Sequence, residues 1–359
     1  MDDLAYRIAL AQVPGIGPSR FRRLETAFGD LRLAWQASGR ELAAAGLDER
    51  TREAILAARQ TTDPDREIER LQRARVQALG WNDPAYPPLL REIDAAPPIL
   101  FVRGTLRDED RRAIAIVGTR RATAYGRQTA ALFARDLADR GYTIVSGLAR
   151  GIDTTAHLAT LETGGRTIGV LGSGVDVIYP AENAKLAARI AEQGALLSEY
   201  PLGTKPAATN FPQRNRIISG LSRGVLVVEG DRKSGALLTL AYALDQNRET
   251  FAVPGSILSP LSAGPNEFIK RGLAKLVTSV DDLVEEVAAT QGQFDFGEAL
   301  PDDPIEAAVL AHLSAEPIHI DDLCALADLP AASVSASLVM LELKGSVRNL
   351  GGMQYARTR

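Results

Sequence analysis

The sequence predicts an α/β protein, in which a Rossmann-like, doubly wound and mostly parallel sheet is flanked by an N-terminal helical domain and a C-terminal winged helix. Three observations predict this order. Apolar residues have helical spacing at the start, strand-like and helix-like segments alternate in the middle, and short helices precede a ribbon at the end. The corresponding domains are expected at residues 1–80, 81–290 and 300–359.

The N-terminal domain is expected to contain helices only, because apolar residues recur every three and four positions between breakers such as Pro14-Gly15 and Gly46. Between the first two helices, VPGIGPSR (13–20) indicates a Gly-x-Gly turn of the helix-hairpin-helix or SAM-like kind, whose N–H groups can hold a nucleic-acid phosphate. A tight turn without a ligand explains the segment equally well. The region has 13 basic and 12 acidic residues, and so no clear positive face.

A proline-rich connector at 83–100 is expected to be extended and packed against a neighbour, since apolar residues lie among its prolines. The strands of the sheet are expected where short apolar segments alternate with stretches long enough for crossover helices. They are 113–118, 142–147, 166–172, 194–200, 225–230 and 249–255. Because ligands bind beyond the carboxyl ends of such strands, the candidate site lies where these segments end.

Several of these strand ends carry candidate anion ligands. At 118–120 (GTR), N–H groups and a guanidinium could bond a phosphate, although a turn glycine is the more frequent meaning; 146–147 (SG) ends the next strand. Asp153 and His157 follow, four residues apart on one helix face. Without a third ligand nearby, a helix carboxylate and a packed imidazole are favoured over a metal or acid/base pair. Residues 234–235 (SG) are a further anion position or a plain helix cap.

The segment TNFPQRNRIISGLS, residues 209–222, is the strongest indication of function. It places Arg214 and Arg216 at the expected start of an amphipathic helix, directly after Phe211 and Pro212, and proline suits a first helical turn. Two guanidiniums there would repel one another and the positive helix end unless an anion is bound. We therefore expect a phosphate site, against the plainer interpretation of a solvated helix start. Phe211 could stack on a base or belong to the core.

Positive charge is concentrated in the middle of the chain, although the formal net charge is −4. Residues 118–150 and 201–235 each hold six basic and two acidic residues, whereas 301–359 hold four basic and eight acidic ones. This distribution favours an anionic ligand on the central domain.

Several function classes are disfavoured by what the sequence lacks. One cysteine, Cys324, and three histidines leave few metal ligands, so we expect no metal and no cofactor. No G-x-x-x-x-G-K-[ST] motif occurs, and LGSGVDVIYP (171–180) lacks a full G-x-G-x-x-G, which disfavours ATP hydrolysis and dinucleotide chemistry. An acidic N-terminus, with no apolar run of about 20 residues, predicts a cytoplasmic protein.

The last domain follows an acidic linker at 293–304. Helical stretches between 305 and 345 precede SVRNLGGMQYAR, and three helices with a two-stranded ribbon turned at Gly351-Gly352 indicate a winged helix. Its expected recognition helix, 333–345, carries Lys344 as its one cation. DNA binding and protein docking therefore both stay open for this domain.

Together, the central motifs resemble those of the DprA/Smf DNA-processing proteins in order and spacing, over residues 85–285. They are GTRRATAYG, SGLARGIDTTAH, GSGVDVIYPAEN, LLSEYPLG, FPQRNRIISGLS, SGALLTLAYAL and FAVPGS. The resemblance implies a single-stranded-DNA-binding protein of natural transformation that protects incoming DNA and loads the recombinase RecA. It also implies a homodimer through the Rossmann domain, here through residues near 235–275.

The resemblance extends to individual residues. It implies that Arg120 corresponds to the arginine of the family's G-[ST]-R phosphate site, that residues 211 and 214–216 correspond to its FPxRNR motif, and that Lys205 corresponds to a preceding basic residue. With the strand-end and helix-start residues above, the candidate DNA-binding residues are Gly118, Thr119, Arg120, Ser146, Gly147, Lys205, Phe211, Arg214, Asn215, Arg216, Ser234 and Gly235. We assign no catalytic residue.

An enzyme is the alternative to a non-enzymatic DNA-binding protein. Nucleotide phosphoribohydrolases of the lysine-decarboxylase-like group share a Rossmann fold and use a PGGxGTxxE signature, which supplies a glycine phosphate loop and a catalytic glutamate. The corresponding segment here, EGDRKSGALLT (229–239), has neither the second-glycine loop nor that glutamate. Hydrolase activity therefore ranks below DNA binding.

Overall fold

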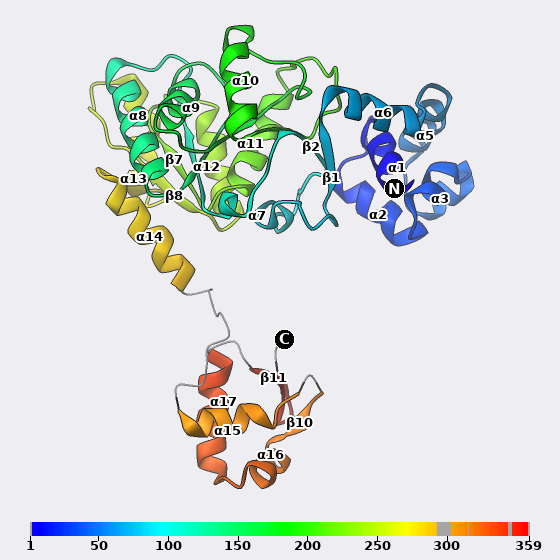
Figure 1. Cartoon of the computed structure of the whole chain (residues 1–359), viewed down its shortest axis with the longest axis vertical. Helices are drawn as coiled ribbons and strands as arrows, with labels where there is room; N and C mark the ends of the chain where they lie inside the picture. Colours follow the sequence, from blue (N-terminus) through cyan, green and yellow to red (C-terminus); the bar gives the residue numbers. More distant parts are fainter. Residues whose placement is uncertain (1, 293–302, 315, 344–346, 358–359) are drawn as a thin grey trace. The chain divides into compact units, whose positions relative to one another are not determined.

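The computed structural model describes residues 2–292, 303–314, 316–343 and 347–357 (Figure 1). Contacts divide the chain into two compact units, Met1–Val284 and Glu285–Arg359. Most of the predicted acidic linker, and Lys344, lie outside the described residues. The boundary that the sequence predicts at residue 80 falls inside the first unit and stays a prediction.

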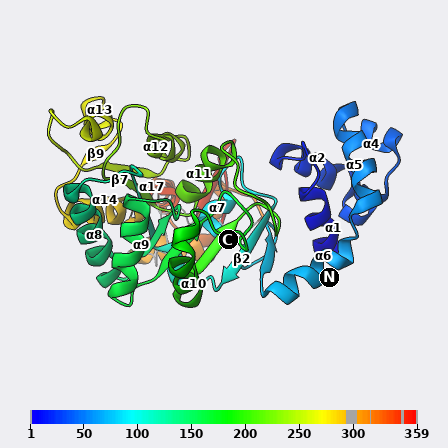
Figure 2. The same cartoon turned by 90° about the horizontal axis from the view of Figure 1, so that it is seen from above.

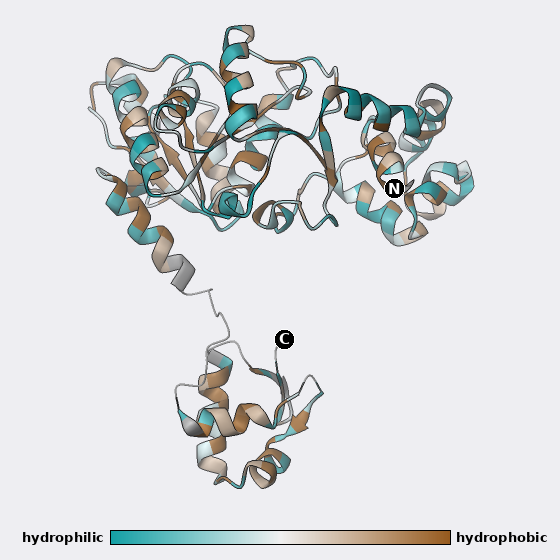
Figure 3. Cartoon of the chain, in the orientation of Figure 1, coloured by the Kyte–Doolittle hydropathy of each residue, from teal (hydrophilic) through white to brown (hydrophobic). Residues whose placement is uncertain are grey.

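Short helices form the beginning of the first unit, as predicted. They are α1 (Asp2–Ala11), α2 (Pro18–Phe28), α3 (Leu31–Gln36), α4 (Gly39–Ala44), α5 (Glu49–Thr61) and α6 (Pro64–Ala74). Side chains of Asp30, Ser38, Asp48 and Asp63 cap α3 to α6 by accepting hydrogen bonds from first-turn N–H groups. Apolar side chains of these helices, such as Phe21, pack in the same hydrophobic core as side chains of the sheet. Helices α5 and α6 are largely hydrophilic, whereas the central strands are hydrophobic (Figure 3).

The expectation of helices only up to residue 80 is wrong at its end. Residues Gln77–Gly80 form β1, which pairs antiparallel with β2 (Ile99–Gly104). Its residues, QALG, show neither an alternation of apolar and polar residues nor a continuous run of large apolar ones, so no strand was expected here. The connector between these strands packs inward as predicted, since Tyr86 is buried and its hydroxyl donates to Pro97 O at 2.9 Å. It is not extended throughout, because Pro88–Arg91 form the short helix α7.

The predicted parallel strands form the middle of a mixed sheet with the order β1-β2-β6-β5-β4-β3-β7-β8-β9. They are β3 (Ala113–Val117), β4 (Thr143–Ser146), β5 (Thr167–Val170), β6 (Ala195–Ser198), β7 (Gly224–Val227) and β8 (Glu249–Ala252). All residues of β3 to β7 are buried, which explains why continuous apolar runs identified them. The short β9 (Lys275–Leu276) extends the sheet beyond β8.

Helices cover both faces of this sheet (Figure 2). Three lie on one face, namely α8 (Ala124–Asp139), α9 (Ile152–Glu162) and α10 (Ala184–Gln193), and on the other lie α11 (Asn210–Gly220) and α12 (Ala236–Asp245). Helices α13 (Ala263–Lys270) and α14 (Val280–Gly292) follow. The chain reverses direction along the sheet after β6, so β3 and β7 are the neighbouring strands at the topological switch point.

The second unit contains a winged helix, as predicted. Helices α15 (Pro304–Ala311), α16 (Ile320–Ala327) and α17 (Ala331–Leu343) enclose a core that includes Leu323 and Leu338. The ribbon strands β11 (Val347–Gly351) and β12 (Gln354–Arg357) turn at Gly351 and Gly352, both with positive φ. A strand that was not predicted, β10 (Ile318–His319), pairs with β12.

The helices were also compared with the length and apolarity that a membrane span requires. Within the described ranges no single helix meets both, although one pair bent by 109°, Ile320–Ala327 with Ala331–Glu342, does so jointly.

Candidate nucleic-acid interface

A small pocket lies where the predicted site was expected, at the carboxyl ends of the parallel strands. Its lining comes from the loops after β3, β4 and β5 and from α11: Arg120, Gly147, Ala149, Arg150, Tyr179, Pro180, Phe211 and Arg214. The inner volume is about 30 Å³, so a single small group fits inside but a nucleotide does not. Three guanidiniums and two aromatic rings therefore surround one opening.

Arg214 forms the buried wall of this pocket. Its Nη1 donates to Gly147 O at 2.6 Å and also to Val170 O, which ties α11 to the ends of two strands. Its Nε is buried without a hydrogen-bond partner among the described residues. Burial lowers the pKa of Arg214 to about 10, and nearby Asp153 opposes that shift. The side chain therefore stays charged at neutral pH and can still donate to an anion.

The structure confirms that Asp153 is a carboxylate at a helix start and that His157 is a packed imidazole, as the sequence favoured. The Asp153 carboxylate, in the first turn of α9, accepts hydrogen bonds from Gly147 N at 3.1 Å and Ala149 N at 3.3 Å. His157 is buried, with Nδ1 2.7 Å from Thr167 Oγ1. Burial raises the pKa of Asp153 to about 6 and lowers the pKa of His157 to about 3. Among the residues that the structure describes, no group of three or more His, Cys, Asp or Glu could hold a metal ion.

The start of α8, which follows residues 118–120, holds an anion that the chain itself supplies. Buried Glu229, at the end of β7, accepts hydrogen bonds from Thr123 N at 2.9 Å and Thr123 Oγ1 at 2.6 Å. A side chain at Gly126 would overlap this carboxylate. The Thr123 N–H and hydroxyl at the start of α8 are thus already bonded to a carboxylate of the chain.

Two of the three residues at 118–120 also make contacts within the protein. The Thr119 N–H donates to Glu229 O at 2.7 Å, and a Cβ at Gly118 would overlap Ile152. Contact of these two residues with DNA stays a prediction. Arg120 is exposed and lies over the Phe211 ring, with its guanidinium carbon 5.3 Å from the ring centroid.

Arg214 and Arg216 do not require an external anion between them, because the Glu199 carboxylate already neutralises Arg216. Its Nη1 and Nη2 bond the Glu199 carboxylate at 2.6 and 2.7 Å, and its Nε donates to Ala95 O. Burial acts to lower the pKa of Arg216, but hydrogen bonding to Glu199 raises it overall. Asn215 bonds Gly235 O at 3.1 Å. The structure therefore brings Arg214 to the pocket and turns Arg216 and Asn215 to internal partners.

The remaining predicted residues lie outside the pocket lining. Ser146 is buried and donates to Ile116 O at 2.6 Å, and the Ser234 hydroxyl accepts from Ala236 N at 3.4 Å, although Gly235 is the residue that caps α12. Lys205 is exposed and has no partner in the described part of the chain. Sequence reasoning missed Arg150 and Tyr179, although both stand within motifs that it quoted, SGLARGIDTTAH and GSGVDVIYPAEN.

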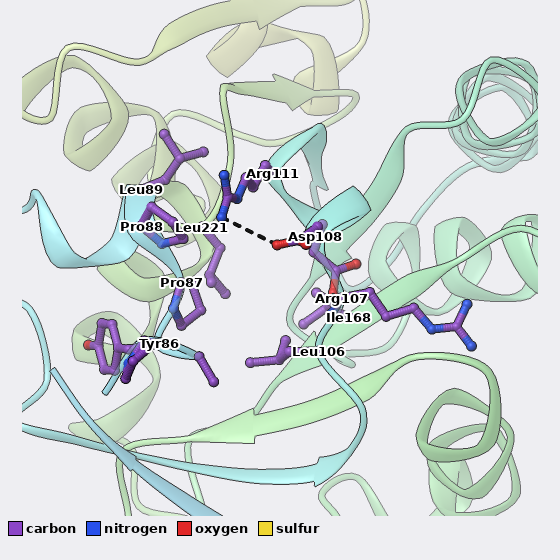
Figure 4. A pocket seen from close by; sticks show the side chains of 13 residues that line it. Tyr86, Pro87, Pro88, Leu89, Leu106, Arg107, Asp108, Arg111, Ile168 and Leu221 are labelled. Atoms are coloured by element: carbon purple, nitrogen blue, oxygen red, sulfur yellow. Dashed lines mark hydrogen bonds and ion pairs between the residues drawn. The ribbon is translucent and has the colours of Figure 1, made fainter. Parts of the chain in front are cut away.

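A second, larger cavity lies at the opposite edge, near the amino-terminal ends of the parallel strands. Its volume is about 300 Å³, and Tyr86, Pro87, Leu89 and Leu106 contribute apolar walls (Figure 4). At its rim Arg111 pairs with Asp108 at 3.3 Å. Its apolar walls distinguish this cavity from the first pocket, which is lined by three guanidiniums.

Comparisons with known proteins support a DNA-related site. The sequence profile of the DNA recombination-mediator protein A family matches residues 77–288, and that of the DprA winged helix domain matches 297–353. Protein Smf of Synechocystis is 37% identical over 394 residues, covering 98% of each chain. The crystal structure of DNA processing protein A from Streptococcus pneumoniae aligns with a TM-score of 0.70 at 35% identity, covering 79% of this chain and 97% of that one. DNA processing protein A from Helicobacter pylori, described by its single-stranded DNA binding mode, aligns with a TM-score of 0.54 at 29% identity, covering 60% and 97%.

Proposed function

The chain belongs to the DNA recombination-mediator protein A family, and from this premise we propose that it binds single-stranded DNA across the carboxyl ends of its parallel strands. The observation that supports this most directly is the pocket ringed by the guanidiniums of Arg120, Arg150 and Arg214. A buried guanidinium with an unpaired N–H is stabilised by a charge-assisted hydrogen bond to an anion. We infer that one DNA phosphate binds inside the pocket and that the rest of the strand lies across its mouth.

Single strands are the preferred form in this proposal. Tyr179 and Phe211 lie beside the guanidiniums, with their ring centroids 5.5 Å apart and their planes inclined by 39°. Unpaired bases can stack on such rings, whereas duplex bases are stacked on one another. Phosphate contacts and stacking carry little sequence information, so we expect weak sequence dependence.

We further propose that bound DNA is protected and transferred to RecA during natural transformation, as the family resemblance implies. The winged helix is proposed as a protein-docking module. On α17, Val339 and Met340 are large exposed apolar residues, where a DNA-reading helix would carry basic ones. The site in this proposal is non-enzymatic, because Asp153, His157 and Glu229 are all buried in internal hydrogen bonds. That bonding of Glu229 also disfavours the phosphoribohydrolase alternative. Cytoplasmic localisation stays a prediction.

Exposed apolar residues support the proposed homodimer through the Rossmann domain. Ile257 and Leu258 are 93% and 88% exposed, and Leu238 and Leu276 are also exposed near the predicted 235–275 region. Apolar side chains so exposed are typical of a surface that another molecule covers, and a two-fold pairing would cover the same patch on both subunits.

A titration tests the proposed function. Fluorescence anisotropy is measured with a labelled oligothymidylate and with a duplex of the same length, over a series of salt concentrations. We expect tighter binding to the single strand, and a logarithm of affinity that falls with the logarithm of salt concentration by about 0.7 per phosphate neutralised. Tighter duplex binding, or affinity independent of salt, would contradict the proposal.

A further inference from the structure

The aromatic pair at the pocket is unequally accessible. The Phe211 ring is covered by the Arg120 guanidinium, touches Tyr179, and lies so close to Gly172 that an added Cβ there would be 3.1 Å from Phe211 Cδ1. Tyr179 is the outer ring and is 45% exposed. A base that approaches the pocket therefore meets more open ring surface on Tyr179 than on Phe211.

The Tyr179 hydroxyl gives no separate reason for a tyrosine at this position. Among the described residues it has no hydrogen-bond partner, whereas the exposed Tyr125 donates to Pro254 O at 2.9 Å and the buried Tyr86 donates to Pro97 O. What Tyr179 presents at the pocket mouth is an aromatic face, and such a face stacks on any base.

Arg150 also lines this pocket, and it is paired with a carboxylate that a phosphate could replace. Its Nε and Nη2 bond the two carboxylate oxygens of Glu182 at 2.9 and 2.8 Å, and the two side chains are 60% and 56% exposed. Hydrogen bonding to Arg150 lowers the pKa of Glu182, so this carboxylate is ionised at neutral pH. An exposed pair contributes little to stability, and a phosphate offers a guanidinium the same two-point geometry. The Arg216–Glu199 pair has the same geometry but side chains only 11% and 17% exposed, so exchange there is disfavoured.

The segments that carry these groups are tied together behind the pocket. Glu182 belongs to a single 3-10 turn, Ala181–Asn183, directly after Tyr179 and Pro180. The buried Asn183 side chain donates to Leu148 O and to Thr154 Oγ1, both at 2.9 Å, on either side of Arg150 in the chain. The segments that carry Arg150, Glu182 and Tyr179 are thus held next to one another around one opening.

We propose that Tyr179 and Arg150 extend the DNA site: the Tyr179 ring stacks on a base next to the phosphate bound by Arg214, and Arg150 leaves Glu182 to bind the adjacent phosphate. Glu182 then acts as an internal competitor that weakens binding and rejects strands with too few phosphates to displace it. This inference deepens the proposed function and rests on it.

Anisotropy titrations of four variants against the same oligothymidylate test the inference. Glu182→Gln is expected to bind roughly threefold tighter, because a neutral amide holds Arg150 less strongly. Its matched control is Glu162→Gln, which removes an equal charge from another exposed pair, with Arg135 at 2.8 Å and a glutamate 55% exposed, outside the pocket lining. Arg150→Met should bind more weakly with a salt slope smaller by about 0.7, and adding Glu182→Gln to it should give no gain.

Stacking is tested by a different readout. A 2-aminopurine base in the oligonucleotide should lose fluorescence on binding the wild type. Tyr179→Ala should abolish this quenching and weaken binding roughly tenfold, whereas Tyr179→Phe should restore both. Thermal unfolding confirms that each variant is folded.

The outcomes separate this inference from the proposed function. If the wild type fails to bind single-stranded DNA, both are overturned. If the wild type binds, but Tyr179→Ala quenches like the wild type or Glu182→Gln binds no tighter than Glu162→Gln, the inference alone is overturned.

Discussion

At the residue scale, the two central arginines of the pocket occupy opposite environments. Arg214 is buried and holds two strand-end carbonyls, whereas Arg120 is exposed and lies against the Phe211 ring. In the proposed complex both bind the same phosphate, but only Arg214 also bonds the strand ends that form the pocket.

This difference makes the two alanine variants distinguishable. Arg120→Ala should weaken single-stranded DNA binding by about 1.5–3 kcal/mol with an unchanged free energy of unfolding, because a charge-assisted hydrogen bond is lost at the surface. Arg214→Ala should weaken binding and also lower the free energy of unfolding by at least about 2 kcal/mol, since Gly147 O and Val170 O lose their buried donor. Urea denaturation beside anisotropy measures both quantities. Equal stability of the two variants would contradict the different roles assigned here.

His157 gives a pH-dependent prediction. Burial lowers its pKa to about 3, against about 6.5 in an unfolded chain, so between these values the unfolded state takes up a proton that the folded state does not. Stability should therefore fall as the pH drops below 6.5, by about 2 kcal/mol at pH 5. Asp153 acts in the opposite sense, since its raised pKa lets the folded state bind a proton first as the pH falls below about 6.

The comparison with His157→Gln isolates the histidine, because Asp153 is present in both proteins. The free energy of unfolding of the wild type relative to the variant should decrease between pH 7 and pH 5, as measured by urea denaturation. A difference that does not change with pH would show that the imidazole is not held neutral by burial.

At the element scale, α8 begins on an anion that the chain supplies. Its cap residue Thr123 bonds the Glu229 carboxylate through both backbone and side chain, and Gly126 leaves the space that the carboxylate occupies. The glycine is thus required by packing against Glu229, since it is an ordinary residue of α8.

Gly126→Ala should therefore destabilise the first unit by about 2 kcal/mol or more, although alanine favours helices over glycine by about 1 kcal/mol. Gly39→Ala is the matched control in the first turn of α4, where an added Cβ would come no closer than 3.8 Å to a described side-chain atom, Leu56 Cδ1. That control should be neutral or slightly stabilising. Denaturation curves that rank the two variants in the reverse order would refute the packing argument.

The parallel strands and the winged helix could be predicted because their patterns are local. A buried parallel strand is a continuous apolar run, and Gly351-Gly352 mark a ribbon turn without reference to the rest of the chain. Partners of charged residues could not be predicted in this way. Glu199 neutralises Arg216 from 17 positions away, and Glu229 caps a helix 106 positions before it. The pocket accordingly lies at the carboxyl ends of the strands, where the sequence placed the candidate site, but the internal partners of Thr119 and Arg216 could not be foreseen.

At the scale of the whole molecule, the two units differ in charge. The last 59 residues hold eight acidic and four basic side chains, so phosphate attraction is expected from the first unit.

Deleting residues 300–359 should therefore leave single-stranded DNA affinity within about tenfold, or ~1.4 kcal/mol, of the full chain at equal salt. Anisotropy titrations of the two proteins measure this. A larger loss of affinity would show that the winged helix binds DNA and that its net negative charge does not predict its contribution to binding.

The proposed dimer gives a prediction about mass. Ile257→Asp combined with Leu258→Asp should convert a dimer into a monomer, because two buried, unpaired carboxylates would oppose the association of apolar patches. Light scattering coupled to size-exclusion chromatography measures the mass directly. The control is Leu33→Asp, which changes a leucine that is 53% exposed on α3 and should leave the mass unchanged. A double variant that stays dimeric would place the interface elsewhere.

The buried Glu229 carboxylate also has a consequence for the binding of free nucleotides in the cell. Free nucleotides and dinucleotide cofactors are abundant there, and proteins with open Rossmann crevices bind them by their phosphates. Here the N–H group at the start of α8 is bonded to the Glu229 carboxylate, which belongs to the same chain and cannot diffuse away. We therefore expect free nucleotides not to bind at the N-terminus of α8, so that changes in nucleotide concentration leave the fraction of DNA-bound protein unaltered through that route.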